Sequence, residues 1–381
     1  MSVKRGGVAL PRDRCVTVGD VIAAMDAWAP PSLAYEWDRP GLAIGQRDWP
    51  VTRVLAALTL GPEAAEAAAL AGAGMIVSHH PPIFEPLRAL RTDDAHTAMC
   101  LMLAEKKIAC FSAHTNLDVA PGGVNDTLAD LLGIVQRSAL VPVPQAGQAK
   151  LVTFVPESHL AAVRDAVCNA GAGVIGAYTH CTFSAAGTGT FLPGEDTLPF
   201  SGKRGELNEE PERRLETLVP MARVAGVIEA LRKAHPYEEP AYDVIEVKHP
   251  GPFAGLGVKG RLKSATTLRA FADHVAKALG APNVRVLGEM SRRVERVAVL
   301  GGSGGSHAGE IRSGVDVFVT GDVNYHAALA ARQNGLAVID AGHDGTEKCI
   351  VPVIGRFLRD TFPGLEVTEF EEPGVWRLAG A

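Results

Sequence analysis

The sequence contains no closely spaced pair of cysteines and no long apolar run. Its six cysteines are scattered over 381 residues, which excludes a disulfide framework and favours reduced thiols in a cytoplasmic protein. Because no stretch of about 18 uncharged apolar residues occurs, we expect no membrane span. Lys4 and Arg5 precede no apolar segment. We therefore expect a loose tail at residues 1–15 instead of a signal peptide.

Basic charge and phosphate-binding loops are also scarce. The net charge is −6, so we expect no binding to nucleic acid or to an anionic membrane. No G-x-x-x-x-G-K-[ST] loop is present, and the G-x-G-x-x-G match at Gly255–Gly260 lacks the context of a dinucleotide site, which favours a glycine-containing strand. A G-x-S-x-G match at Gly301–Gly305 would make Ser303 a nucleophile. That reading leaves the metal-competent residues unexplained, so we interpret the match as a tight loop near a metal pocket.

Apolar segments alternate with helical segments in two parts of the chain. Strands are predicted at 54–58, 75–78 and 108–114 in the first part, and short apolar strands recur after residue 290. The segment between them differs, because a strand and a helix recur twice around a glycine-rich, charged middle. This pattern predicts an α/β protein with a discontinuous core. Its parts are two similar lobes, residues 16–141 and 251–381, and an inserted small α+β domain, residues 142–250.

Two adjacent histidines, His79 and His80, follow the strand predicted at 75–78. Neighbouring residues of a regular strand point to opposite faces and could not serve one site. Pro81 and Pro82 come next, and proline ends a strand because it lacks the ladder donor. We therefore expect the break to turn both imidazoles toward one side.

Two later segments also place metal-competent residues at strand ends. Asp118 follows the strand predicted at 108–114, and His343 and Glu347 follow the strand at 337–340 with the i, i+4 spacing of one helix face. Taken singly, Asp118 could shape a turn and Glu347 could favour a helix start. Together, these positions converge at the carboxyl ends of parallel strands. Three histidines and two carboxylates suit two ions of Zn, Mn, Fe or Co, because they exceed the ligands of one catalytic zinc.

These motifs carry a resemblance that extends from residue 16 over nearly the whole chain. Ser78–Phe84, Ala113–Asp118 and Gly342–Glu347 resemble the three signatures of the GTP cyclohydrolase I type 2 homologue family, also called the Nif-three-like proteins. Gly321-Asp322 with Tyr325-His326 resembles a fourth motif. Segments from Ala170–Gly173 to His235–Pro240 resemble the inserted domain of longer members, which is similar to the PII/CutA-type fold.

The resemblance implies a dinuclear metal centre and a toroidal homohexamer. The implied ligands are His79, His80, Asp118, His343 and Glu347, and none of these positions is altered. Two departures occur elsewhere. Thr59 stands where family members often have aspartate, and Trp37–Leu42 departs from the usual Trp-Asp-Asn-Val-Gly-Leu at two positions.

A second group of candidates lies beside strand ends. His114, Asp322 and His326 are expected to orient ligands or contact substrate, with a catalytic proton transfer as a further role. The function predicted from the residues and the family together is a metal-dependent hydrolase of GTP or another nucleotide or phosphoester, acting through a hydroxide that bridges two divalent ions. The alternative is a non-catalytic, metal-binding hexameric regulatory or scaffold protein.

Overall fold

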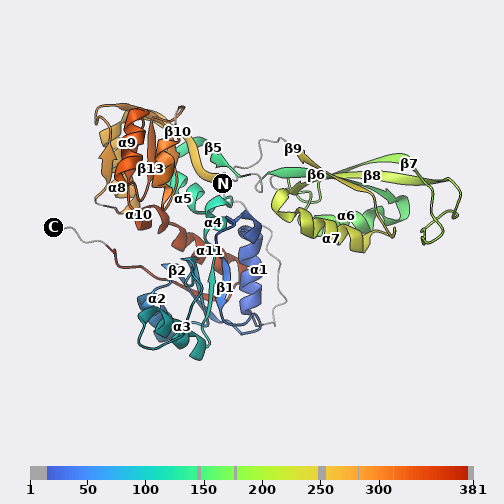
Figure 1. Cartoon of the computed structure of the whole chain (residues 1–381), viewed down its shortest axis with the longest axis horizontal. Coiled ribbons are helices and arrows are strands. Elements are labelled where there is room, and N and C mark those ends of the chain that lie inside the picture. Colours follow the sequence, from blue (N-terminus) through green and yellow to red (C-terminus); the bar gives the residue numbers. More distant parts are fainter. Residues whose placement is uncertain are drawn as a thin grey trace. The chain divides into compact units, whose positions relative to one another are not determined.

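The computed structural model describes residues 15–143, 147–175, 178–247, 255–281, 283–311 and 313–375. Of the loose tail predicted at residues 1–15, only Cys15 lies within these ranges. The described chain divides into two compact units (Figure 1). One unit contains residues 147–247, and the other joins residues 15–143 to residues 255–375. Within the described ranges, no helix is long and apolar enough to cross a membrane.

The first sheet of the larger unit consists mainly of parallel strands. Its order is β1 (Gly41–Ile44), β4 (Ala109–Ser112), β3 (Met75–His80), β2 (Arg53–Thr59) and β15 (Glu366–Glu369). Only the pairing of β1 with β4 is antiparallel. The crossover helices are α2 (Pro62–Leu70) and α3 (Ala95–Glu105), and α1 (Val18–Trp28) and the 3-10 turn η1 (Pro31–Leu33) precede β1. Parallel pairing brings the carboxyl ends of β2, β3 and β4 to one edge.

The second sheet has a parallel centre and antiparallel edges. Its order is β11 (Arg285–Leu287), β14 (Ala337–Asp340), β13 (Val317–Thr320), β12 (Arg293–Val299), β10 (Gly255–Thr267) and β5 (Ile134–Pro142). Strands β12, β13 and β14 are parallel. The associated helices are α8 (Leu268–Leu279), η5 (Gly304–Gly309) and α9 (Tyr325–Gln333). The G-x-G-x-x-G segment is part of β10, as expected from its context.

The two lobes exchange strands. β5 comes from the first half of the sequence but pairs with β10 in the second sheet, and β15 comes from the C-terminal half but pairs with β2 in the first. Between the sheets lie α4 (Thr115–Val119), α5 (Val124–Leu131) and α10 (His343–Glu347) (Figure 1). Helix α11 (Ile350–Thr361) then packs on β2 and β15. The boundaries at residues 141 and 251 stay a prediction, and the exchange shows that neither lobe is one continuous segment.

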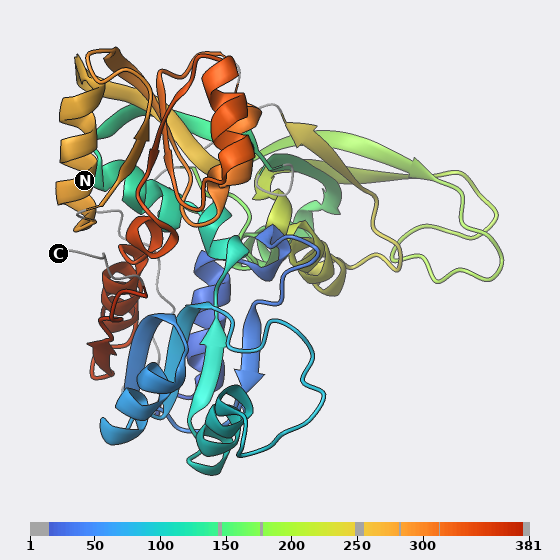
Figure 2. The same ribbon diagram turned by 60° about the vertical axis from the view of Figure 1, so that its left-hand side comes forward.

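The smaller unit is a four-stranded antiparallel sheet with two helices. Its elements are β6 (Gln148–Pro156), η3 (Glu157–His159), α6 (Leu160–Asn169), β7 (Thr182–Phe191), β8 (Asn208–Pro220), η4 (Met221–Arg223), α7 (Val224–Ala234) and β9 (Tyr242–Val247). The strand order β7-β8-β6-β9 and this sequence of elements define a split βαββαβ topology. The hairpin of β7 and β8 extends well beyond the helices (Figure 2). The predicted α/β class is confirmed for the protein as a whole.

Helix α11 offers a test of how the C-terminal segment stabilises the first lobe. We expect Ile354→Ala to lower the free energy of unfolding by about 2–5 kcal/mol, because a buried side chain is lost and a cavity remains. Ile354 is fully buried, whereas Arg356 on the same helix is exposed. In urea denaturation, Arg356→Ala should change stability by no more than about 0.5 kcal/mol. Equal effects of the two substitutions would contradict the packing of α11 on the first sheet.

Candidate metal centre

The carboxyl edge of the first sheet brings together residues from three separate segments. His79 and His80 are the last two residues of β3, His114 and Asp118 follow β4, and His343 and Glu347 begin and end α10. Ligand atoms of these residues form three overlapping groups within 4.8 Å. The groups are His79 with His80 and His114, His80 with His343 and Glu347, and His79 with Asp118 and Glu347.

The strand β3 continues through both histidines, so the strand end predicted at Ser78 lies two residues too early. The rings of His79 and His80 are 5.0 Å apart and tilted by 44°. Both nevertheless reach Glu347, because the cluster lies beyond the strand end and not over one face. Side chains that leave the last two strand residues in different directions can converge there.

Glu347 divides the cluster into two sides. Its Oε2 lies 2.9 Å from His80 Nε2 and 3.1 Å from His343 Nε2. Its Oε1 lies 3.8 Å from His79 Nε2, which is in turn 3.7 Å from Asp118 Oδ1. A carboxylate with one oxygen on each side has the arrangement of a ligand that bridges two ions.

The atoms on the Asp118 side have the chemistry that a bound cation requires. His79 Nε2 and Asp118 Oδ1 are buried and have no hydrogen-bond partner among the described residues. Leaving such atoms unpaired costs about 1–3 kcal/mol each. Imidazole nitrogen and carboxylate oxygen are ligands of Zn, Mn, Fe and Co, so the residues present fit a divalent metal.

Each histidine is oriented by a partner at Nδ1. His79 Nδ1 donates to the carbonyl oxygen of Ala113 at 2.8 Å, and His80 Nδ1 lies 2.8 Å from Thr59 Oγ1. The other two donate to carboxylates at 2.7 Å, His114 to Asp38 and His343 to Asp322. Since Nδ1 is occupied, Nε2 is left for the cluster, as in metal sites where a partner fixes the imidazole tautomer.

The electrostatics of the cluster favour positive charge on both sides of Glu347. For His79, burial lowers the pKa, but the charges of Asp118 and Glu347 outweigh burial and raise it to about 9. The hydrogen bond to Glu347 is the main reason that the pKa of His343 is raised to about 9. Burial raises the pKa of Asp118 to about 7, with His79 opposing it. Burial alone would raise the pKa of Glu347, but hydrogen bonds from the imidazoles hold it well below its usual range.

The glycine loop that resembles G-x-S-x-G lies directly against Glu347. Gly302 has φ +65°, and a Cβ built there would meet Glu347 Oε1 at 2.0 Å and His343 Nε2 at 3.2 Å. Its N–H donates to Thr346 Oγ1, while the N–H of Gly301 donates to Asn125 Oδ1, both at 2.9 Å. The loop therefore needs a glycine at residue 302 to let Glu347 enter the cluster.

An aromatic wall formed by Tyr35, Trp37 and Phe84 stands beside His114. Tyr35 and Trp37 are stacked with centroids 5.6 Å apart. The ring of Trp37 is 6.0 Å from Phe84 and 6.3 Å from His114. Trp37 is 56% exposed and Phe84 46% exposed, so large rings face solvent beside the charged cluster. Such rings provide a surface on which a flat ligand can stack.

Of the second group of candidates predicted from the sequence, His114, Asp322 and His326, only some lie at the cluster. His114 joins the cluster, and Asp322 reaches it through His343. His326 is exposed on α9, and its ring contacts Tyr325 with centroids 5.5 Å apart. The structure does not bring His326 into any of the three groups.

Sequence reasoning missed the partner of His114. Asp38 accepts hydrogen bonds from His114 and from the backbone N–H and hydroxyl of Thr115. Burial raises its pKa, but these bonds and the charge of His114 outweigh burial and lower it to about 2. The sequence signal that could have identified Asp38 was the Trp37–Leu42 motif, because this chain has the aspartate of the usual family motif at that position.

The fold and the cluster together define an α/β protein with a candidate two-metal centre between two lobes. The chain belongs to the Duf34/NIF3 (NGG1p interacting factor 3) family, whose model matches residues 16–373. It is 44% identical over 325 residues to a protein of Halalkalibacterium halodurans and 40% identical over 324 residues to one of Bacillus subtilis. Each match covers 85% of this chain and 87% of the relative. Both relatives are named "GTP cyclohydrolase 1 type 2 homolog", and the resemblance stated from the motifs is confirmed.

Solved structures of relatives share the fold. A Bacillus cereus protein related to NIF3 is similar with a TM-score of 0.83 and 38% identity, covering 96% of this chain and 100% of that one. A Staphylococcus aureus protein is similar with a TM-score of 0.71 and 27% identity, covering 95% of this chain and 99% of that one. Both alignments therefore extend over nearly the full length of this chain and of the solved structures.

Gly302 provides a test of the position of Glu347. We expect Gly302→Ala to weaken metal binding strongly, because its Cβ would displace the Glu347 carboxylate. The matched control is Gly314→Ala, which also has positive φ (+81°) but opens onto free space. Metal content after dialysis against Mn or Zn measures the effect. Equal metal retention by the two variants would show that Glu347 does not need its observed position.

Thr59 provides a test of the contact that orients the His80 ring. Thr59→Val removes the hydroxyl that lies against Nδ1, and we expect metal affinity to fall about 10–100-fold, as for loss of such partners elsewhere. Thr52→Val, at an exposed position before β2, is the control. Competition titration with a chromophoric chelator gives both affinities. An unchanged affinity in Thr59→Val would assign the hydroxyl no role in the centre.

Proposed function

We propose that this protein is a metal-dependent hydrolase that holds two divalent ions and acts on nucleotides or phosphoesters, GTP among them. The observation that carries the proposal is the Glu347 carboxylate, which has His80 and His343 at one oxygen and His79 with Asp118 near the other. Two such sides suit two ions that share a bridging carboxylate. His79, His80, Asp118, His343 and Glu347 would be the ligands.

In the proposed reaction, the residues of this chain would bind the ions and orient the groups around them. When bound, two divalent ions would polarise a scissile group and lower the pKa of a bound water, so that hydroxide is available near neutral pH. His114 is backed by Asp38 and lies beside the proposed ligands, so its Nε2 can contact substrate or carry a proton. Asp322 holds the ring of His343 in place. Imidazole and carboxylate ligands suit Zn, Mn, Fe and Co.

The aromatic wall supports a substrate that carries a flat ring. Trp37 and Phe84 expose their rings within 6.3 Å of the His114 ring, and a nucleobase stacks well on such side chains. The name of the relatives refers to GTP cyclohydrolase, a reaction on a guanine nucleotide. A toroidal homohexamer and a cytoplasmic location belong to the same proposal.

The decisive experiment combines metal loading with hydrolysis assays. Protein loaded with Mn or Zn is assayed on GTP, GMP and a phosphoester without a ring. We expect turnover that Asp118→Ala reduces by more than about 100-fold, because a ligand is lost. Asp360→Ala, at an exposed position on α11, should keep full activity.

Three outcomes would contradict this function in different ways. Turnover that survives Asp118→Ala would reject the metal mechanism. Two bound ions without any turnover would favour the non-catalytic regulatory or scaffold role. Protein that takes up neither Mn nor Zn would reject both.

A further inference from the structure

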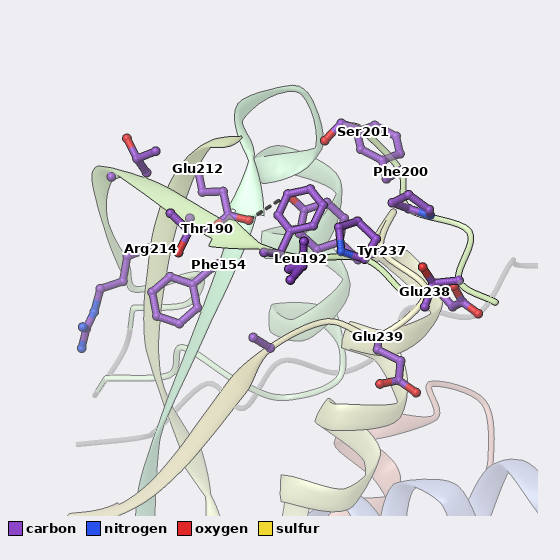
Figure 3. A pocket seen from close by; sticks show the side chains of 18 of the residues that line it. Phe154, Thr190, Leu192, Phe200, Ser201, Glu212, Arg214, Tyr237, Glu238 and Glu239 are labelled. Atoms are coloured by element: carbon purple, nitrogen blue, oxygen red, sulfur yellow. Dashed lines mark hydrogen bonds between the residues drawn. The ribbon is translucent and has the colours of Figure 1, made fainter. Parts of the chain in front are cut away.

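The smaller unit contains a cavity of about 700 Å³ that has no role in the proposed hydrolysis. It lies between the β7–β8 hairpin and the segment His235–Pro240, with β6 contributing Phe154 (Figure 3). Its volume is in the range of small-molecule sites. The β7 segment along it, residues 185–190, reads Ala-Ala-Gly-Thr-Gly-Thr, so small side chains leave the space open.

Aromatic rings line this cavity from four separate segments. They are Phe154 on β6, Phe191 at the end of β7, Phe200 in the loop between β7 and β8, and Tyr237 after α7. Phe200 and Tyr237 have ring centroids 6.0 Å apart. The segment of Tyr237 is anchored by the buried His235, whose Nε2 lies 3.0 Å from the carbonyl oxygen of Phe154. A contact within the fold thus holds the backbone that carries Tyr237.

A carboxylate is positioned among these rings. The phenol of Tyr237 donates to Glu212 Oε1 at 2.7 Å (Figure 3). Burial, and then the contact with Glu212, raises the pKa of Tyr237, so the phenol keeps its proton and remains the donor. A Cβ on Gly189 would lie 2.3 Å from Glu212 Oε2. The glycine therefore permits this carboxylate to lie against β7, where it accepts hydrogen bonds but donates none.

The charges around the cavity are predominantly negative. Glu212, Glu238 and Glu239 line it, and Arg214 is the basic residue in the described lining. Arg214 is already paired with Glu216 at 2.8 Å. Its guanidinium points away from Tyr237 in Figure 3. A ligand that brings positive charge and hydrogen-bond donors is therefore complementary to this site.

We propose that the cavity of the smaller unit binds an organic cation that carries an amine or amidine on a flat apolar body. The apolar body lies among Phe154, Phe200 and Tyr237. The charged group lies at Glu212, where a carboxylate and aromatic faces attract the same cation. This site is separate in sequence from every residue of the candidate metal centre.

Benzamidine and benzamide form a matched pair of probes, because they have nearly the same shape and differ in charge. In isothermal titration calorimetry of the full-length protein, the affinity for benzamidine should be about tenfold higher than the affinity for benzamide. We expect Glu212→Gln to remove this preference and Phe200→Ala to weaken both probes. Glu209→Gln, at an exposed position on β8 outside the cavity lining, should retain the preference.

Each other outcome overturns the proposal. Equal affinity for the two probes would show that charge is not recognised. A preference that persists in both Glu212→Gln and Phe200→Ala would place the probe elsewhere, including at the aromatic wall of the larger unit. No saturable binding of either probe would show that the cavity is not a free ligand site, for example because a second copy of the chain fills it.

Discussion

The larger unit is organised around one shared carboxylate, that of Glu347. Its side chain is 5% exposed and lies among three imidazoles. A buried anion is stable only when cationic or hydrogen-bonding groups satisfy it. The surrounding imidazoles meet that demand. The pKa is raised at His79 and His343, whereas burial lowers it at His80. Any cation bound here replaces protons that the cluster would otherwise hold.

The cluster depends on residues from both lobes, which also exchange strands. Helix α10 follows the second sheet, yet its carboxylate reaches histidines at the edge of the first. A hydrogen-bonded path fixes the distance between these elements. Asn125 donates to the backbone oxygen of Asp118 and accepts from Gly301, and the next residue, Gly302, donates to Thr346 beside Glu347. Because these groups come from α4, α5, the glycine loop and α10, neither lobe could form the cluster alone.

Much of the cluster could be predicted because each residue lies at the end of an apolar strand or shortly after one. Short apolar runs precede His79, Asp118 and His343. A βαβ connection places the carboxyl ends of β3 and β4 together, whereas β14, before His343, belongs to the second sheet. The i, i+4 spacing of His343 and Glu347 likewise anticipated the short helix α10. The error in the end of β3 arose because the prolines stop the ladder after His80 and not before His79.

Other features depend on contacts that no local pattern reports. Asp38 lies in a loop, and only the fold brings it to His114. The need for glycine at residue 302 arises from Glu347, 45 positions later. The cavity of the smaller unit combines a run of small residues on β7 with aromatic rings from four segments. Periodicity predicts which residues form an element, but not which distant side chains share a space.

Glu347 is proposed to lie between two metal positions. Anomalous diffraction from crystals grown with Mn measures this directly. We expect two peaks per chain about 3.5–4 Å apart, one toward His79 and Asp118 and the other toward His80 and His343. A single peak, or none under saturating Mn, would contradict it.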